Sequence, residues 1–290
     1  MKTALVTLAR HENPYLKDWI NHYRDIGIDH IIIGDNNDIF NDEDIESLVK
    51  ELGYQDFVTV IPKKRGGSQQ QNTDIQRDFF NEMYQKYKND YDWFCFFDVD
   101  EYLETIPTYC ENNINSYIQK NIMEFTSRYE HVPETIMVGW LHFDDNDKLF
   151  YEDKPVYERF TRVSDKIYFS HLHRNVFVGK SIVKGSVNDL VFVDMHAPIC
   201  TEHELQVCFN GGIDRETFHS QSRRFIHIDA ILKHYYSKSI EEFINRRFKD
   251  KASYATTGQF DNCYNDFFAV NRWSHEKQKL FELYKQLYNE

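Results

Sequence analysis

The amino-acid sequence predicts an α/β fold, in which a mixed sheet flanked by helices is followed by a helical C-terminal extension. Up to residue 103, β-branched or aromatic runs alternate with segments of helical periodicity over short connections. That alternation is typical of parallel strands joined by right-handed crossovers. Beyond it, short β-like runs indicate antiparallel additions to the sheet. We therefore expect one domain at 1–235, with halves at 1–103 and 104–235, and a helical extension at 236–290 packed on it.

The elements of the first half can be justified in order. Residues 3–9 form an apolar run that predicts the first core strand. Asn13 and Pro14 supply an N-cap and a first-turn proline to a helix whose apolar residues recur at helical spacing and which ends at Gly27. The same reasoning predicts strands at 30–34, 57–61 and 92–97, and helices at 42–52 and 74–88.

The second half and the tail are patterned less regularly. Ser239 and Glu242 match a capping box at the start of a helix. The expected elements are a helix at 109–123, a strand at 135–143, short β-like runs at 167–169, 175–178 and 190–193, and helices at 239–249 and 274–288.

The strand at 92–97 ends in three acids, Asp98, Asp100 and Glu101. Its aromatic residues show no polar alternation, so we expect a strand buried on both faces. Carboxylates crowded at the edge of a core repel one another unless a positive charge lies between them. A divalent cation would supply that charge, and open α/β sheets bind ligands at the carboxyl ends of their strands. A solvated acidic turn is the alternative, and a metal site holding a phosphate-bearing substrate is our hypothesis.

Three further segments could carry chemistry. His234 precedes the capped helix and is either a satisfied core histidine or a nitrogen ligand to manganese. Trp140 stands close to the acids Asp144 and Asp145, a pairing typical of sugar sites, although a core tryptophan before a polar turn has the same pattern. Arg10 and its neighbours follow the first strand, where they are either ligand contacts or surface charges.

Charge and cysteine content restrict the function further. The formal net charge of −13 argues against a general nucleic-acid binder. The five cysteines are scattered without a Cys-x-x-Cys pair, which is typical of a reducing cytoplasm and indicates no zinc site. No segment is apolar over the length of a membrane span. A basic cluster at Arg246, Arg247, Lys249 and Lys251 is either a peripheral membrane contact or a solvated helix face.

Several segments in the same order resemble glycosyltransferase family 92 and the family 2-like group of GT-A fold enzymes, of the bacterial cell-surface polysaccharide type. The resemblance covers roughly residues 3–250 and includes the acidic strand end. Its segments are Arg10-His11-Glu12, Tyr15-Leu16-x-x-Trp19, Gly27-Ile28-Asp29-His30, Asp35-Asn36, Trp93, Asp98-Val99-Asp100-Glu101-Tyr102-Leu103, Trp140-x-x-Phe143-x-Asp145-Asn146 and His234-Tyr235-x-x-Lys238-Ser239.

The resemblance implies a role for each matching residue. Asp98, Asp100 and His234 would hold Mn²⁺ (or Mg²⁺), with Asp98 also contacting the donor. Asp145 would be the general base in an inverting displacement, but Asp144 stands where a glycine is expected, so the choice between the two acids stays open. The nucleotide-sugar would be bound by Ala9, Arg10, Glu12, Asp35, Asn36, Gln76, Asp98 and Trp140.

The resemblance also implies the reaction and its partners. The enzyme would be an inverting hexosyltransferase whose first half binds a nucleotide-sugar, usually a UDP-sugar, and whose second half binds a glycan or lipid-linked glycan acceptor. We expect it in the cytoplasm, at the inner face of the membrane, in cell-surface polysaccharide or lipopolysaccharide synthesis. Two other classes stay open: a metal-dependent nucleotidyltransferase or phosphatase on a similar sheet, and a non-catalytic nucleotide-sugar binder.

Overall fold

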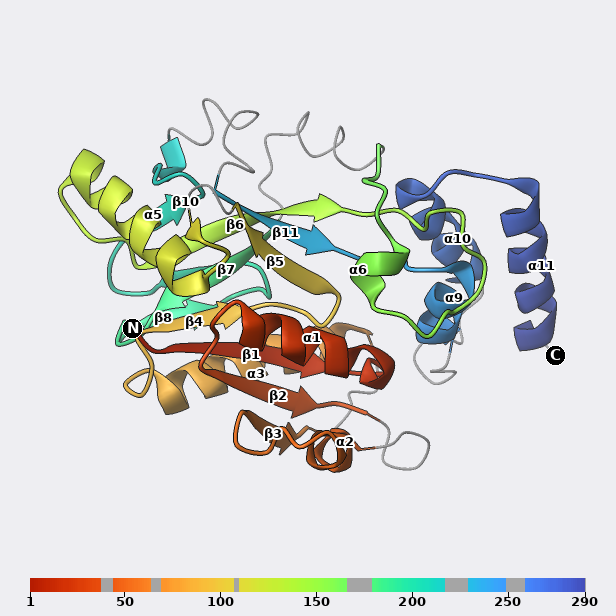
Figure 1. Ribbon diagram of the computed structural model, residues 1–290, viewed down its shortest axis with the longest axis horizontal. Helices are drawn as coiled ribbons and strands as arrows, with labels where there is room; N and C mark the ends of the chain where they lie inside the picture. The colour runs from red at the N-terminus through yellow and green to blue at the C-terminus, as the bar shows by residue number, and fades with distance from the viewer. Residues whose placement is uncertain are drawn as a thin grey trace.

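A mixed β-sheet forms the centre of the protein (Figure 1). The computed structural model describes residues 1–37, 44–63, 69–106, 110–165, 179–216, 229–248 and 259–289. Among these, nine strands form the main sheet in the order β3-β2-β1-β4-β7-β6-β11-β5, with β10 paired to β6, and β8 pairs with β9 in a second sheet. The strands are β1 (Thr3–Ala9), β2 (His30–Asp35), β3 (Val58–Pro62), β4 (Trp93–Phe96), β5 (Glu101–Thr105), β6 (Thr135–His142), β7 (Gly179–Lys184), β8 (Leu190–Phe192), β9 (Pro198–Cys200), β10 (Val207–Phe209) and β11 (Ala230–His234).

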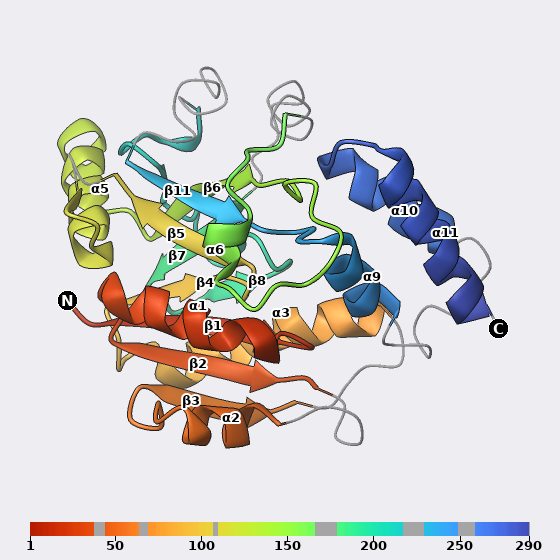
Figure 2. The ribbon, with the colours of Figure 1, turned by 45° about the vertical axis from the view of Figure 1, so that its right-hand side comes forward.

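In the first half of the chain the helices alternate with strands, as predicted. At the end of the described part of the chain, three helices form a group. Figures 1 and 2 show α9, α10 and α11 together beyond the ends of β6 and β11. The helices are α1 (Asn13–Asp25), α2 (Ile45–Glu51), α3 (Gln69–Tyr87), α5 (Ile114–Tyr129), α6 (Val156–Arg159), α9 (Ile240–Phe248), α10 (Gln259–Val270) and α11 (His275–Asn289). The predicted fold class, a mixed α/β sheet with flanking helices and C-terminal helices, is confirmed.

The first half is a parallel, doubly wound unit. β1 pairs in parallel with both β2 and β4, and β2 pairs in parallel with β3. Successive strand residues face different cores: Leu5 packs with the helices α1, α2 and α5, whereas Val6 packs with α3 and β8. The predicted burial of β4 on both faces is confirmed, since Cys95 belongs to the first core and Phe96 to the second.

Small differences from the predicted boundaries have local causes. Glu12, not Asn13, is the N-cap of α1 and makes no side-chain capping bond. Asn13 is the first residue of the helix, and its side-chain oxygen accepts a hydrogen bond from Asn37. Asp44 caps α2 through the amide of Ser47, so this helix starts later than predicted.

The second half contains strands that local patterns did not reveal. The central strand β7 pairs antiparallel with both β4 and β6, which confirms the expected antiparallel additions. The sequence analysis missed β5, β7, β9, β10, β11 and the helices α6 and α10, because most of these are short and their burial depends on distant partners. The expected β-like runs at 167–169 and 175–178 lie outside the described residues.

The C-terminal helices have a small core of their own. Phe243 of α9, Phe267 of α10 and Phe281 of α11 are buried against one another. The predicted capping box is confirmed: the Ser239 amide donates to Glu242, whose own amide donates to Ser239 Oγ. Within the described part of the chain, no helix combines the length and the apolar character that crossing a membrane requires.

Candidate active site

The acidic turn after β4 is held rigidly by its own backbone and by α1. The amide of Glu101 donates to the Asp98 carbonyl at 3.0 Å, and the Asp98 amide donates to Glu101 Oε2 at 2.8 Å. The indole Nε1 of Trp19 donates to the carbonyls of both residues. Trp19 therefore aligns the turn from the neighbouring helix.

Asp98 has two side-chain partners. Gln76 Nε2 on α3 donates to Oδ1 at 2.7 Å, and Lys180 Nζ on β7 lies 2.8 Å from Oδ2. The Lys180 side chain is fully buried. Although burial opposes its charge, the carboxylates of Asp98 and Glu101 raise the pKa of Lys180. A buried ammonium group thus neutralises the first acid of the turn.

The partners of Asp100 come from the C-terminal part of the chain. Arg246 Nη1 on α9 donates to Oδ2 at 2.8 Å, and His234 Nε2 at the end of β11 lies 3.6 Å from Oδ1. Burial opposes ionisation, but His234, Arg246 and Lys238 together hold the pKa of Asp100 well below its ordinary value. Asp100 is therefore a carboxylate in a buried, cation-rich setting.

Asp100, Glu101 and His234 form a buried group with ligand atoms within 4.8 Å of one another. Two of their atoms, Glu101 Oε1 and His234 Nδ1, are buried without a hydrogen-bond partner. Burial, together with the charges of Asp98 and Asp100 and against that of Lys180, raises the pKa of Glu101 well above its ordinary value. Two carboxyl groups and an imidazole suit a divalent cation, so these residues could hold a metal.

The structure thus brings two of the three predicted metal ligands together and adds one. Asp100 and His234 lie in the group, and Glu101, to which the sequence analysis assigned no role, lies with them. Asp98 instead contacts Lys180 and Gln76.

Residues predicted to bind the nucleotide lie at the ends of β1 and β2. Ala9 pairs with Asp35 across the two strands, and the Asn36 amide donates to the Ala9 carbonyl. The Asp35 carboxylate accepts the amides of Asn37 and Ile45 and so supports the segment that leads into α2. Arg10 is half-buried directly after β1.

Glu12 connects this strand end to the C-terminal helices. Its two carboxylate oxygens each lie 3.3 Å from a cation, Lys238 Nζ and Arg246 Nη1. Lys238 also lies over the ring of Tyr15, 4.0 Å from the centroid. Two cations are thereby fixed beside Asp100.

A cleft of about 720 Å³ opens beside these cations, between the start of α1 and α9. Arg246 lines the cleft and also donates a hydrogen bond to Asp100, so its side chain connects the cleft to the acidic group. The lining residues are His11, Pro14, Tyr15, Tyr151, Tyr236, Ser237, Lys238, Glu241, Glu242, Phe243, Asn245 and Arg246.

Trp140 lies on β6 among histidines. Its ring centroid is 4.5 Å from that of His234, 5.2 Å from His196 and 5.4 Å from His142. β6 pairs in parallel with β11, which sets Trp140 beside Leu232 and His142 beside His234. The predicted sugar-binding tryptophan therefore lies next to a predicted metal ligand.

Both candidate bases are held in ion pairs. Asp145 is fully buried and lies 2.7 Å from Lys277 Nζ of α11, and burial raises its pKa. Its amide donates to Asn271 Oδ1. Asp144 is also buried, with Arg162 Nε 2.6 Å away. A general-base role for either acid stays a prediction.

Sequence reasoning missed Lys180 and misread Arg246. Lys180 is the one charged residue of Gly179-Lys180-Ser181-Ile182-Val183, and a lysine inside such a run is a signal of a buried ion pair. Arg246 was assigned to a basic surface cluster, but it points to Asp100. The Arg247 side chain and residues Lys249 and Lys251 lie outside the described part of the chain.

Comparisons with known proteins identify the family of the chain. The family model described as Glycosyltransferase family 92 matches residues 8–262. No curated protein matches the chain. Among solved structures, S. aureus TarS is similar at a TM-score of 0.40 and 8% sequence identity, over 92% of this chain. The match spans 43% of the TarS chain.

Proposed function

Since this chain belongs to glycosyltransferase family 92 and is a glycosyltransferase, we propose that it transfers a hexosyl group from a nucleotide-sugar to a glycan with inversion. The observation that carries the proposal is the buried group of Asp100, Glu101 and His234, with two unpartnered ligand atoms, which Arg246 connects to the cleft. A UDP-sugar is the proposed donor, and a glycan or lipid-linked glycan is the proposed acceptor.

The proposed cofactor is Mn²⁺ or Mg²⁺, held by Asp100, His234 and Glu101. When bound, such an ion supplies positive charge to the diphosphate leaving group. Its carboxylate ligands suit both ions, and the imidazole favours Mn²⁺. Glu101 would release its proton on binding, since its carboxyl group is stabilised in the neutral form by burial.

The protein's own cations have a related task. Arg246 and Lys238 line the cleft and lie within reach of a diphosphate placed there. Charges that are already fixed in a partly buried site do not have to reorganise during the reaction, so they stabilise the negative charge that develops on a leaving oxygen. Glu12 and Asp100 hold Arg246 in position before the donor arrives.

Trp140 is proposed to contact the donor sugar. Gln76 and Asp98 are proposed to position the donor. An aromatic face packs on the apolar C–H face of a sugar ring. Inversion requires a base opposite the leaving group, and Asp145, with Asp144 as the other candidate, is proposed for it. Residues 1–103 are proposed as the nucleotide-binding half of one catalytic domain at 1–235, and residues 104–235 as its acceptor half.

We propose that the enzyme works in the cytoplasm, at the inner face of the membrane, in the synthesis of cell-surface polysaccharide or lipopolysaccharide. All five cysteines are free, as is usual in a reducing compartment. Fractionation of cells, with detection of the chain in cytosolic and membrane pellets, tests this location.

A nucleotide-sugar screen tests the reaction. Purified protein is incubated with UDP-, GDP- and dTDP-sugars, with manganese or with EDTA, and the nucleotide products are separated. Manganese-dependent release of UDP from a UDP-sugar supports the proposal. Release of pyrophosphate or inorganic phosphate would instead assign a nucleotidyltransferase or phosphatase, and donor binding without any turnover would assign a non-catalytic binder.

A further inference from the structure

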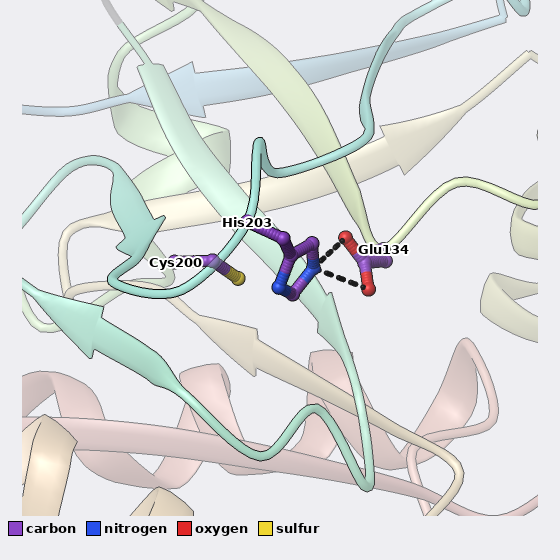
Figure 3. A group of neighbouring side chains, drawn as sticks. All are labelled: Glu134, Cys200 and His203. Carbon is purple, nitrogen blue, oxygen red and sulfur yellow. Dashed lines mark hydrogen bonds and ion pairs between the residues drawn. The ribbon is translucent and has the colours of Figure 1, made fainter.

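A second group of metal-ligating side chains lies away from the active site, at the opposite end of β6. Glu134 immediately precedes β6, whose other end carries Trp140. One ligand atom each from Glu134, Cys200 and His203 lie within 4.8 Å of one another. Figure 3 shows the His203 imidazole between the Cys200 sulfur and the Glu134 carboxylate. Two segments of the second half of the chain, at residue 134 and at residues 200–203, therefore converge at this point.

Each ring nitrogen of His203 faces a carboxylate. Nε2 lies 3.0 Å from Glu134 Oε2, and Nδ1 lies 3.1 Å from Asp189 Oδ1. The amide of Gln206 fixes Glu134, and the amide of Glu202 fixes Asp189. Backbone donors thus hold both carboxylates in place around the imidazole.

We propose that Cys200, His203, Glu134 and Asp189 form a binding site for Zn²⁺ or a similar divalent cation, distinct from the active site. Thiolate, imidazole and carboxylate are the ligand types that zinc takes in protein sites. The ion is bound by Cys200, one imidazole nitrogen and the carboxylate on that side. The other ring nitrogen donates its proton to the remaining carboxylate, an arrangement that fixes the tautomer of a metal-bound histidine.

The distances between the ligand atoms are close to those of a zinc site. Ligand atoms of a tetrahedral zinc site are roughly 3.3–3.8 Å apart, given bond lengths of about 2.0–2.3 Å. The group in the structure is within 4.8 Å, and the His203–Glu134 pair is already closer than the tetrahedral spacing. The Cys200 sulfur lies within the same 4.8 Å of the other two ligand atoms, so closing on the ion requires only a local adjustment of its side chain.

The local charge also favours a cation. Two carboxylates surround a single imidazole, so the group carries negative charge even when His203 is protonated. Zinc is bound by the thiolate, so Cys200 loses its proton on binding. When the metal–sulfur bond forms, that proton passes to solvent.

The site would cross-link three segments: the residue before β6, the end of β9 with the turn after it, and the turn before β8. Ligands from separate segments bind an ion only when the fold brings them together, so ion binding stabilises the folded state. The role inferred is structural, and the reaction at the other end of β6 does not depend on it.

Cobalt is a suitable probe because a thiolate–cobalt bond gives a near-ultraviolet charge-transfer band. The full chain is titrated with Co²⁺, then with Zn²⁺. We expect saturation at one equivalent, displacement of the band by Zn²⁺, and a zinc-dependent rise in the melting temperature. The group of Asp100, Glu101 and His234 contains no thiol, so cobalt bound there does not give the band.

Matched variants complete the test. C200S is expected to remove the band and to lower the zinc-dependent rise in melting temperature to the part that the group of Asp100, Glu101 and His234 contributes, and H203Q to weaken cobalt binding at least tenfold. C263S and H275Q, which alter a cysteine and a histidine elsewhere, are expected to retain both. If C200S does not fold, the double variant E134Q/D189N replaces it and is expected to lose the band. Absence of the band in the unaltered protein at millimolar cobalt, or its persistence in C200S, would overturn the proposal.

Discussion

Arg246 on α9 donates a hydrogen bond to Asp100 in the turn after β4, with 2.8 Å between Nη1 and Oδ2. The two residues are far apart in the sequence, and their contact joins the C-terminal extension to the candidate metal group. Arg246 also lines the adjacent cleft. Helix α9 of the C-terminal extension therefore contributes to the candidate active site, and the family match, which extends to residue 262, includes α9.

Replacing Asp100 with asparagine tests the metal group. The amide has nearly the same shape but no charge, so we expect transfer to fall at least 100-fold because the carboxylate ligand is lost. The manganese-dependent rise in melting temperature should disappear as well. The measurements are UDP release and thermal unfolding with and without manganese.

The control for this variant is Asp56→Asn, which changes an exposed aspartate outside the site. It should behave as the unaltered protein in both assays. Undiminished transfer by Asp100→Asn would show that Asp100 is no metal ligand.

Lys180→Met is expected to destabilise the fold by about 3 kcal/mol, because it leaves the carboxyl groups of Asp98 and Glu101 without their buried cation. Urea unfolding followed by circular dichroism measures the free energy. The comparison variant is Lys50→Met, at an exposed position of α2, for which a change below about 0.5 kcal/mol is expected. Equal stability of the two variants would argue against the ion pair described here.

Asp145→Asn tests the general base. If Asp145 accepts the acceptor proton, transfer should fall about 100- to 10,000-fold while UDP affinity is kept. Lys277→Met is the matched variant, since it breaks the same ion pair and leaves the carboxylate in place. Similar losses in both variants would indicate that Asp145 acts through structure, and in that case Asp144→Asn is the next variant to assay.

Ser239→Ala removes half of the capping box of α9. We expect a loss of about 1 kcal/mol in the free energy of unfolding. Because the same helix carries Arg246, transfer should fall too, through a rise in the donor KM. Ser127→Ala, at an exposed position near the end of α5, is the control and should leave both quantities unchanged. A normal donor KM in Ser239→Ala would separate the cap from donor binding.

His22 gives the protein a defined pH dependence. Burial lowers its pKa below the ordinary value near 6.5, so the unfolded chain takes up a proton more readily than the folded one. The stability that depends on neutral His22 is therefore complete above about pH 6.5 and is lost as the pH falls below it. Gln at this position can still donate to the Leu103 carbonyl.

We therefore expect the stability advantage of the unaltered protein over His22→Gln to shrink between pH 8 and pH 5. Urea unfolding at both pH values measures it. An advantage that stays constant or grows toward pH 5 would contradict the assignment.

The sequence alone determined the features that depend on neighbouring residues. The strand at β1, the burial of β4 on both faces and the capping box of α9 were all predicted, because each depends on apolar periodicity or on hydrogen bonds between residues a few positions apart. The ordered set of motifs also predicted the family that residues 8–262 match. Asp100 and His234 were named as partners on this basis, and the structure brings them together.

The tertiary structure alone decided how the buried charges are balanced. Lys180 comes from a strand that inserts between β4 and β6, and Arg246 comes from a helix of the extension. Glu101 lies in the candidate metal group because β5 pairs with β11 and sets it opposite His234. Coulombic compensation depends on distance in space and not in sequence, so a local pattern reveals an acid that needs a cation but not the residue that supplies it.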